Sequence, residues 1–299
     1  MYSETPSPSF MLFAVATAAT SSELKTRIAE FWNAEPCGTR YLDDGADFAA
    51  HALSRYALEP HIPRFAKFNE SAGLRVLEVG VGMGADYEQW LKAGANATGV
   101  DLSAASLVQA RRRCELAGLK PDLQLADAEH LPFADQTFDI VYSYGVLHHS
   151  PDTAKCLGEA WRVLKPGGQA RIMLYHHRSI TGFLLWLRYG VWRGQSIRQC
   201  VYERLESPGT KTFTVAEVRS VFAGFANPQF ADLQLKDLQH NDLRFEQVFS
   251  PGDLLLHRPS ARFQSPLYRL VWKLFPRNLV RKFGKRWGLF LLITARKPK

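Results

Sequence analysis

Residues Arg75–Trp90 read RVLEVGVGMGADYEQW. An apolar run ends at an acid, Glu78, glycines follow at positions 80, 82 and 84, and a helix-like segment comes next. A glycine-rich turn between a strand and a helix lets backbone N–H groups approach a ligand, typically an adenosine nucleotide. Because such a turn alone is weak evidence, the residues that follow have to identify the ligand.

Strand-like and helix-like segments alternate along residues 74–176. The helix over 103–118 has a plausible N-cap at Ser103 and a stop at Gly118. This alternation predicts a parallel sheet covered by helices on both faces, with its ligand outside the carboxyl ends of the strands. We expect strands at 75–80, 96–101, 122–128, 138–145 and 169–177, and helices at 85–94, 103–118 and 151–168.

The residues around the turn distinguish between two adenosine cofactors. Asp101 ends the second strand, where a carboxylate can accept both ribose hydroxyls. The turn reads GxGxG rather than the GxGxxG of dinucleotide sites, and Glu78 would repel a pyrophosphate. Glu78 would suit a cationic ligand with an ammonium and a sulfonium, so S-adenosylmethionine is favoured over NAD. A plain tight turn for the glycines, and helix capping by Asp101 and Asp127, are the simpler alternatives.

Five sequence blocks in order resemble the class I S-adenosylmethionine-dependent methyltransferases. The similarity is to the branch related to the ubiquinone/menaquinone-biosynthesis methyltransferases, and it covers about residues 74–175, a third of the chain. The blocks are VLEVGVGMG, GVDLS, DAEHLPFADQTFDIVYS, GVLHH and EAWRVLKPGG.

This resemblance implies roles for the residues at the strand ends. Glu78, Gly80 and Gly82 would surround the methionine part of the cofactor, and Asp101 would accept the ribose hydroxyls. The remaining expected cofactor contacts are Leu102, Asp127 and Ala128 at the adenine, and Ser143 and Tyr144 at the methionine.

The resemblance also implies an α/β fold: a seven-stranded Rossmann-like methyltransferase sheet with helices on both faces. Strand six is expected at 230–238 and strand seven, antiparallel, at 288–297, with an insertion over 239–287 before the last strand. The chain then divides into a loosely held extension (1–20), an N-terminal helical lid (21–70), the cofactor-binding core (71–178), a substrate cap with strand six and a basic insertion (179–287), and the final strand (288–299).

The segments outside the core are expected to select the acceptor. A helix followed by a Pro-Cys-Gly turn is predicted over 21–41, and a second helical stretch over 43–68. The apolar, aromatic segment 179–194 is either a cap over an apolar acceptor or a buried helix. Trp32 and Tyr56 would line the lid or anchor the core. Candidate substrate-binding residues are Tyr41, Tyr175, His177 and Trp186.

Methyl transfer requires alignment of the acceptor with the activated methyl group, and a base only where the acceptor must lose a proton. His148 is the first candidate for that base and His176 the second, since both lie at predicted strand ends. Capping of the next helix is the alternative for His148. No metal site is expected, because no carboxylate ligand pattern joins the histidines.

The charge of +8 is concentrated in the last residues of the chain. Residues 261–299 hold 11 Lys and Arg and no Asp or Glu, and without them the total becomes −3. Within this part, 265–288 has the pattern of a cationic amphipathic helix, which suggests either packing on the body or peripheral contact with an anionic membrane. Nucleic acid is an improbable partner, since no RNA-binding module is recognisable.

Composition bounds the remaining questions. Four separated cysteines predict neither a disulfide framework nor a zinc knuckle, which suits a reducing, cytoplasmic location, and no apolar run reaches membrane-spanning length. The expected function is methyl transfer from S-adenosylmethionine to a small hydrophobic or aromatic acceptor. Three alternatives remain. The protein could catalyse other chemistry on S-adenosylmethionine, such as cyclisation or aminopropyl-type transfer. It could also be a non-catalytic adenosine-ligand-binding protein or a dehydrogenase.

Overall fold

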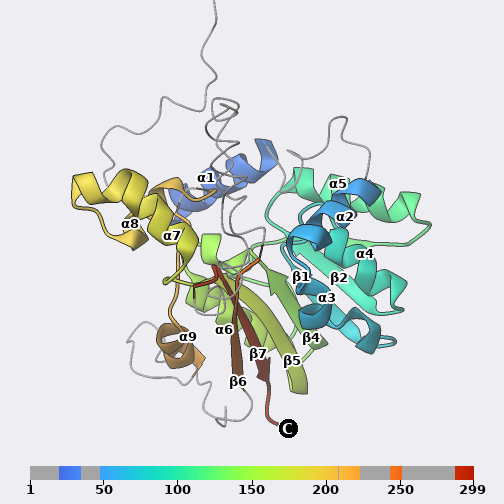
Figure 1. Ribbon diagram of the computed structural model, residues 1–299. Coiled ribbons are helices and arrows are strands. Elements are labelled where there is room, and N and C mark those ends of the chain that lie inside the picture. Colours follow the sequence, from blue (N-terminus) through green and yellow to red (C-terminus); the bar gives the residue numbers. More distant parts are fainter. Residues whose placement is uncertain (1–19, 35–47, 208, 223–242, 251–286) are drawn as a thin grey trace, which may run out of the picture.

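The computed structural model describes residues 20–34, 48–207, 209–222, 243–250 and 287–299 (Figure 1). Seven strands in this part form one sheet in the order β3-β2-β1-β4-β5-β7-β6. The first five strands pair in parallel, and β7 is antiparallel to both β5 and β6. The predicted fold class is confirmed. The strands are β1 (Arg75–Val79), β2 (Asn96–Asp101), β3 (Asp122–Leu125), β4 (Phe138–Tyr144), β5 (Leu164–Tyr175), β6 (Leu243–Val248) and β7 (Phe290–Arg296).

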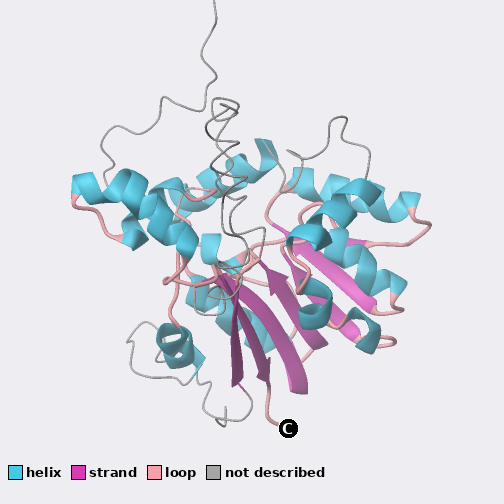
Figure 2. Cartoon of the chain, in the orientation of Figure 1, coloured by secondary structure: helices cyan, strands magenta, loops and turns pink. Residues whose placement is uncertain are grey.

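Helices cover both faces of this sheet (Figure 2). One buried cluster includes side chains of α3, α4, α5 and α8, whereas the other includes side chains of α6 and α9. Helix α1 crosses above the carboxyl ends of the parallel strands (Figure 1). The described helices are α1 (Ser21–Ala34), α2 (Phe48–Leu58), α3 (Ile62–Ala66), α4 (Ala85–Lys92), α5 (Ala104–Leu116), α6 (Thr153–Val163), α7 (Ile180–Leu185), α8 (Ile197–Arg204) and α9 (Val215–Phe222), with short turns η3 (Phe68–Glu70), η4 (Leu147–His149), η5 (Trp186–Gly190) and η6 (Val191–Arg193).

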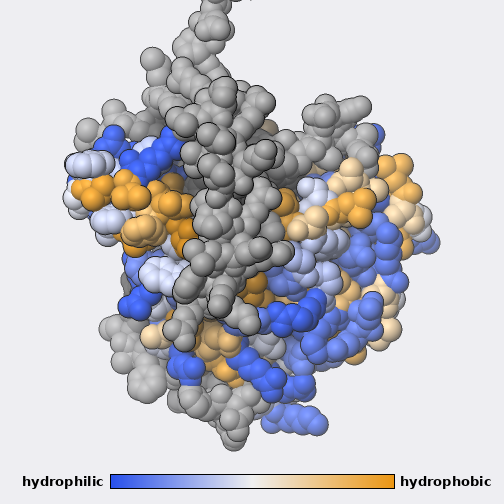
Figure 3. All heavy atoms as spheres, viewed as in Figure 1, coloured by the Kyte–Doolittle hydropathy of each residue, from blue (hydrophilic) through white to orange (hydrophobic). Residues whose placement is uncertain are grey.

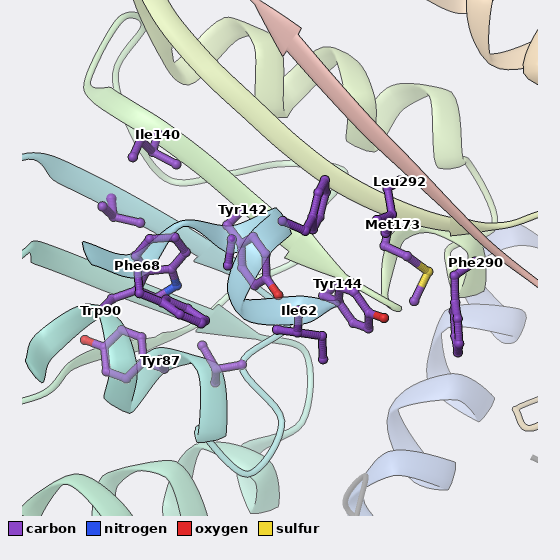
Figure 4. Close-up of a cluster of buried hydrophobic side chains, with 14 of the residues drawn as sticks. Ile62, Phe68, Tyr87, Trp90, Ile140, Tyr142, Tyr144, Met173, Phe290 and Leu292 are labelled. Atoms are coloured by element: carbon purple, nitrogen blue, oxygen red, sulfur yellow. The ribbon is translucent and has the colours of Figure 1, made fainter. Parts of the chain in front are cut away.

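Strand β4 shows how sequence alternation places side chains on the two faces. Tyr142 and Tyr144 belong to an aromatic cluster that includes Trp90 of α4, at 5.4 Å from the Tyr142 ring centre (Figure 4). Val141, which precedes Tyr142, lies in the opposite cluster, as period-two alternation requires. Burying apolar surface on both faces is the main driving force for this fold.

Several predicted boundaries are confirmed closely. Strand β2 begins and ends where expected, and β7 lies within the predicted 288–297. The Ser103 side chain accepts a hydrogen bond from the Ser106 N–H, which confirms it as the N-cap of α5.

The prediction of one helix over 151–168 is wrong in its second part. Helix α6 ends at Val163, and Leu164 already pairs with Phe138 as the start of β5. Pro166 cannot continue a helix, and Gly167 adopts φ +77° while its N–H donates to the Lys297 carbonyl. The chain therefore turns directly into a strand, and β5 runs from 164 to 175 rather than from 169 to 177.

The predicted position of strand six is also wrong. The expected segment 230–238 lies outside the described residues, and the sixth strand is Leu243–Val248, paired antiparallel with β7. Its sequence, LRFEQV, alternates equally well, so periodicity alone could not choose between the two segments. The connection between the last two strands consequently spans 249–289 rather than 239–287.

The segments outside the core are more broken than predicted. The stretch expected over 43–68 is interrupted at Pro60, between α2 and α3. Helix α1 ends at Ala34, before the expected Pro-Cys-Gly turn, which lies outside the described residues. The segment 179–194 forms α7, η5 and η6 in succession, with some side chains buried and others exposed, so it is not a fully buried helix. None of the helices in the described part of the chain combines the length and apolarity that a membrane crossing requires.

Candidate functional site

The glycine turn lies where the strand order reverses, since β1 sits between β2 and β4. Gly80 and Gly84 adopt φ of +82° and +75°, which side-chain-bearing residues rarely adopt. A Cβ on Gly80 would lie 2.2 Å from the Val146 side chain, which belongs to the loop after β4. The turn is therefore tightly packed against the next strand end, at the position where ligands bind in open parallel sheets.

Asp101 is held at the end of β2 by the backbone. Its Oδ2 accepts the Gly82 N–H at 2.9 Å, and its Oδ1 accepts the Ser103 N–H at 2.8 Å. Burial raises the pKa of this carboxyl, and the two N–H donors oppose that effect. The acid thus fixes both the glycine turn and the start of α5, and it is still partly exposed.

Glu78 is buried beneath the turn. It is 3% exposed, and its Oε2 has no hydrogen-bond partner. Burial, together with the nearby Asp86, raises the pKa of Glu78 well above its usual value. An unpaired buried carboxyl is costly, so this position favours a cationic partner.

Asp86, in the first turn of α4, has the partners that Glu78 lacks. The Arg55 guanidinium of α2 donates to both of its carboxylate oxygens, at 3.0 and 2.6 Å. The hydroxyls of Tyr56 and Tyr142 also donate to it, at 3.0 and 2.8 Å. Burial alone would raise the pKa of Asp86, but Arg55 and the two hydroxyls hold it below its usual value.

Helix α1 closes over the ends of β2 and β3. Its Lys25 contacts Asp127 at 2.7 Å and Glu129 at 2.5 Å. Asn33, at the other end of the helix, lies 2.8 Å from the Ser103 hydroxyl. The Asp127 backbone-facing oxygen accepts the Glu129 N–H at 2.9 Å. The predicted adenine-binding acid is therefore in contact with helix α1.

The other predicted cofactor residues occupy the same edge. Leu102 and Ala128 are partly exposed beside Asp101 and Asp127. Ser143 is buried and donates to the Val79 carbonyl at 2.9 Å. The Tyr144 hydroxyl lies 2.6 Å from Nε2 of His61, on the opposite face of β4 from Ser143.

A second polar group lies at the ends of β4 and β5. His148 is fully buried against the Tyr175 ring, with ring centres 3.9 Å apart, and neither of its nitrogens has a hydrogen-bond partner. Burial, then His149 and Lys211, lowers the pKa of His148 well below its usual value. Tyr175 donates to Glu206 at 2.9 Å, and Glu206 lies 3.4 Å from Nε2 of His149.

The remaining candidates lie farther along the edge. Nδ1 of His176 contacts the Gln247 amide at 2.9 Å and the Arg178 N–H at 3.2 Å, so this nitrogen already has partners in the sheet. Nδ1 of His177 lies 3.4 Å from the Thr212 hydroxyl. The Trp186 indole donates to the Gln195 carbonyl at 2.9 Å and closes its own turn. Tyr41 lies outside the described residues.

Sequence reasoning missed the residues that come from distant segments. Arg55, Lys25 and Glu206 carry no motif, and their partners lie 31, 102 and 57 positions away along the sequence. The backbone of Glu206 has a φ of +54°, which is unusual for a residue with a side chain. This feature is seen only in the folded structure, so the sequence could not have pointed to Glu206.

The site fits S-adenosylmethionine on its own chemistry. Glu78 offers an unpaired buried carboxyl to a cation, Asp101 presents a carboxylate at the end of β2, and the positive-φ glycines let a ligand approach the backbone. A pyrophosphate at this position would be repelled by the carboxylates of Glu78 and Asp101, since neither neutralises its charge.

Comparison with known proteins agrees with this chemistry. Residues 77–172 match a family model described as a methyltransferase domain. The chain is 43% identical over 168 residues to phthiotriol/phenolphthiotriol dimycocerosates methyltransferase 1 of Mycobacterium ulcerans, covering 50% of this chain and 60% of that protein. It is 33% identical over 197 residues to the chloroplastic tocopherol O-methyltransferase of Arabidopsis thaliana, covering 56% and 55%.

Solved structures resemble the fold as a whole. The YcgJ protein of Bacillus subtilis superposes with a TM-score of 0.51 at 18% identity, over 82% of this chain and 99% of that one. The chain spans little more than half the length of the two curated relatives named above. Within it, residues 77–172 are the part that matches the methyltransferase-domain family model.

Proposed function

We propose that the protein transfers a methyl group from S-adenosylmethionine to a small hydrophobic or aromatic acceptor by in-line displacement. The observation that carries this proposal is the buried Glu78 carboxyl, whose Oε2 has no hydrogen-bond partner among the described residues, beneath a glycine turn at the point where strand order reverses. The cofactor bears an ammonium and a sulfonium, and burial strengthens their attraction to a carboxylate.

In this proposal Glu78, Gly80 and Gly82 surround the methionine part, with Ser143 and Tyr144 on its far side. The Asp101 carboxylate accepts hydrogen bonds from the ribose hydroxyls, either in place of its backbone N–H donors or in addition to them. Asp127 accepts from the adenine amino group, and Leu102 and the Ala128 backbone contact the ring. The partial exposure of Asp101, Leu102 and Ala128 supports these roles, because a ligand can reach them.

His148 is the better of the two candidate bases. Both of its nitrogens lack partners, whereas Nδ1 of His176 already contacts Gln247 and Arg178. Burial keeps the His148 imidazole neutral, which is the form that accepts a proton. We assign Tyr175, His177 and Trp186 to the acceptor side, together with Tyr41 of the undescribed 35–47.

The acceptor class is supported by the relatives' names. One relative is named for phthiotriol and phenolphthiotriol dimycocerosates and another for tocopherol. A related acceptor would need an apolar entrance. The aromatic segment over 179–194 supplies apolar surface near β5, and the proposal keeps the ubiquinone/menaquinone-like branch as the nearest type of chemistry.

We further propose that the protein works against an anionic lipid surface. The segment 265–288, singled out for this role by its sequence, lies almost entirely outside the described residues. In the described part, apolar side chains on α7 to η6 are exposed beside Arg188 and Arg193, and Figure 3 shows apolar atoms gathered over α7 and α8. We call this the α7–η6 patch: Phe183, Leu184, Leu187, Val191 and Trp192.

The domain organisation follows from these roles. We propose that residues 21–70 form the lid, 71–178 the cofactor-binding core, 179–287 the acceptor cap and basic insertion, and 288–299 the strand that completes the sheet. The contacts of Lys25 and Arg55 with core acids support the lid assignment. The extension 1–20 has no assigned role.

The test follows label from methyl-labelled S-adenosylmethionine. Purified full-length protein is incubated with a deproteinised extract of the source organism, and label is measured in organic-soluble, water-soluble and RNA fractions. We expect label in the organic-soluble fraction with the wild type and none with Asp101→Asn. Asp139→Asn is the matched control, because its carboxylate also accepts a backbone N–H, from Arg75 at 2.9 Å, but at the opposite edge of the sheet.

Each other outcome has a definite meaning. Consumption of S-adenosylmethionine without label in any fraction would replace methyl transfer by another reaction of the cofactor. Binding without consumption would favour a non-catalytic adenosine-ligand-binding protein. Label in the RNA fraction would contradict the small-molecule acceptor.

A further inference from the structure

Two histidines and one glutamate form a compact cluster beside the proposed cofactor site. His148 and His149 lie on η4, and Glu206 follows α8. One ligand atom from each of the three lies within 4.8 Å of the others, and Nε2 of His149 lies 3.4 Å from Oε2 of Glu206. With metal–ligand bonds of about 2.0–2.1 Å, two ligands of a tetrahedral ion lie about 3.3 Å apart.

The histidines in this cluster lack hydrogen bonds at the nitrogens that matter. Among the described residues, both ring nitrogens of His148 and Nε2 of His149 have no hydrogen-bond partner, although the two side chains are 0% and 5% exposed. Buried imidazole nitrogens are nearly always paired, because leaving them unpaired costs the full desolvation penalty. Three unpaired nitrogen positions around one carboxylate therefore point to a missing cation.

Two hydroxyls contact Nδ1 of His149. The Thr210 hydroxyl donates its only hydrogen to the Ser207 carbonyl at 2.8 Å, so toward Nδ1, at 3.0 Å, it can only accept. The Ser207 hydroxyl, at 2.8 Å from Nδ1, can donate or accept. In the tautomer that satisfies Thr210, Nδ1 carries the hydrogen and Nε2 presents a lone pair toward the carboxylate of Glu206. A cation between these two acceptors would satisfy both.

The groups around the cluster also resemble the outer shell of a metal site. Ligating histidines usually donate their second N–H to an oxygen, and ligating carboxylates are themselves hydrogen-bonded. Here Nδ1 of His149 lies 3.0 Å from the Thr210 hydroxyl and 2.8 Å from the Ser207 hydroxyl, two oxygens that can accept its N–H, and Glu206 accepts from Tyr175. Glu206 holds its position with φ +54°, a strained conformation that is concentrated at functional sites.

A second acidic cluster provides the contrast. Asp127, Glu129 and His130 also place three candidate ligand atoms close together. The Lys25 ammonium already lies between the two carboxylates, at 2.7 and 2.5 Å. In the described part of the chain, no Lys or Arg is in ion-pair contact with Glu206. One cluster is neutralised by an ammonium, and the other is not.

We infer that His148, His149 and Glu206 bind a divalent transition-metal ion of the Zn²⁺ or Fe²⁺ type, leaving one or more positions open. Two imidazoles and one carboxylate form a ligand set that such ions take in catalytic sites. A Lewis acid here, next to the loop whose Val146 packs on Gly80, would polarise an acceptor hydroxyl. His148 would then be a metal ligand and could not act as the general base.

The test uses metal binding rather than turnover. Full-length protein is stripped with a chelator and titrated with Co²⁺, whose visible absorption reports coordination by nitrogen and oxygen ligands. We expect about one Co²⁺ per chain, weakened by about a hundredfold or more in Glu206→Gln and by about tenfold to a hundredfold in Thr210→Val. Metal analysis of untreated protein identifies the natural ion.

Matched control variants and a second measurement test whether any loss of Co²⁺ binding is specific to the proposed site. Glu129→Gln and His130→Gln alter the cluster that Lys25 neutralises and should leave the Co²⁺ affinity unchanged. S-adenosylhomocysteine binding, measured on every variant, shows that the protein is folded. The inference is overturned if wild type that binds S-adenosylhomocysteine gives no cobalt spectrum, or if Glu129→Gln weakens Co²⁺ as much as Glu206→Gln. Metal binding does not depend on methyl transfer, so either proposal can fail alone.

Discussion

The two halves of the functional edge pair their polar groups differently. At the ends of β1, β2 and β3, Asp101 and Asp127 accept backbone N–H groups from residues two positions further along the chain. At the ends of β4 and β5, His149 finds its partners 58 and 61 positions away, and His148 has none. In the first half these local contacts add to longer-range ones from Gly82 and Lys25, whereas in the second half the partners of His149 named here are all distant in sequence.

This difference suggests a division of labour. Acids that are held in part by hydrogen bonds from their own loop depend less on the distant segments around them. A group assembled from η4, β5 and the loop after α8 can change with any of those segments. We therefore expect damage in the first half to appear as lost stability or lost cofactor affinity, and damage in the second half to leave cofactor affinity intact.

The largest expected effect is on Arg55. Replacing it with Met leaves the buried Asp86, which is 3% exposed, without its guanidinium, and we expect a loss of about 3 kcal/mol of unfolding free energy near neutral pH. Chemical denaturation measures this loss. Arg64→Met is the matched control, because its ion pair with Glu246 is largely exposed and should contribute less than about 1 kcal/mol.

The pH dependence of the Arg55 variant has a definite sign. In the wild type the pKa of Asp86 is lowered, so its stabilising contribution is present above its unfolded pKa and lost as the pH falls through the folded value. Without Arg55, burial raises that pKa, and stability then falls as the pH rises from about 4 to about 7. A difference between wild type and variant that does not grow over this range would contradict the network described here.

The second expected effect is on Asp101, where cofactor affinity rather than stability is measured. Asp101→Asn replaces a carboxylate that orders Gly82 and Ser103 and could accept the ribose. We expect the Kd for S-adenosylhomocysteine to rise by about tenfold to a hundredfold, the equivalent of one charge-assisted hydrogen bond. Calorimetric titration with S-adenosylhomocysteine compares Asp101→Asn with Asp139→Asn. Equal affinities in the two variants would show that Asp101 does not contribute to cofactor binding.

What could be predicted from the sequence follows the same division. The glycine turn, the N-cap at Ser103 and the strand ending at Asp101 depend on neighbours within a few residues, so local pattern sufficed for them. The prediction of a helix over Leu164–Gly168 failed because these residues pair with β4 and hydrogen-bond to the chain after β7. Only the assembled sheet supplies these partners.

Long-range contacts were beyond any local pattern. Lys25 and Glu206 are ordinary charged residues in their own segments, and their importance comes from what the fold brings next to them. For the same reason the sequence predicted no metal ligands, because the carboxylate nearest to His149 in space is 57 positions away in the chain. Two equally alternating segments likewise competed for strand six, and pairing with β7 chose Leu243–Val248.

A smaller effect should follow from removing one hydroxyl in the second half. Tyr175→Phe keeps the ring that stacks on His148 but leaves Glu206 without its donor at 2.9 Å. We expect a loss of about 1.5 kcal/mol of unfolding free energy and slower methyl transfer, with the Kd for S-adenosylhomocysteine changed by less than about twofold. If that Kd moved as far as it does in Asp101→Asn, the two halves would not be independent.

The smallest effect on the folded protein is expected outside both halves, on the α7–η6 patch. Trp192 is 88% exposed, so Trp192→Ser should change the unfolding free energy by less than about 0.5 kcal/mol. Binding to anionic vesicles, measured by sedimentation, should fall by about tenfold, because a Trp side chain entering the lipid interface contributes about 1.5–3 kcal/mol. Leu116→Ser is the matched control, since Leu116 is 69% exposed on α5 without neighbours from the patch.

The outcome of that last comparison separates two origins of the exposed apolar surface. If Trp192→Ser releases the protein from vesicles and Leu116→Ser does not, the patch is a specific lipid contact beside the half of the edge that we assign to the acceptor. An acceptor dissolved in the membrane would then enter from the side of β5, away from the glycine turn. If both variants bind vesicles like the wild type, lipid contact through this patch is excluded, and the acceptor must reach the site from solution.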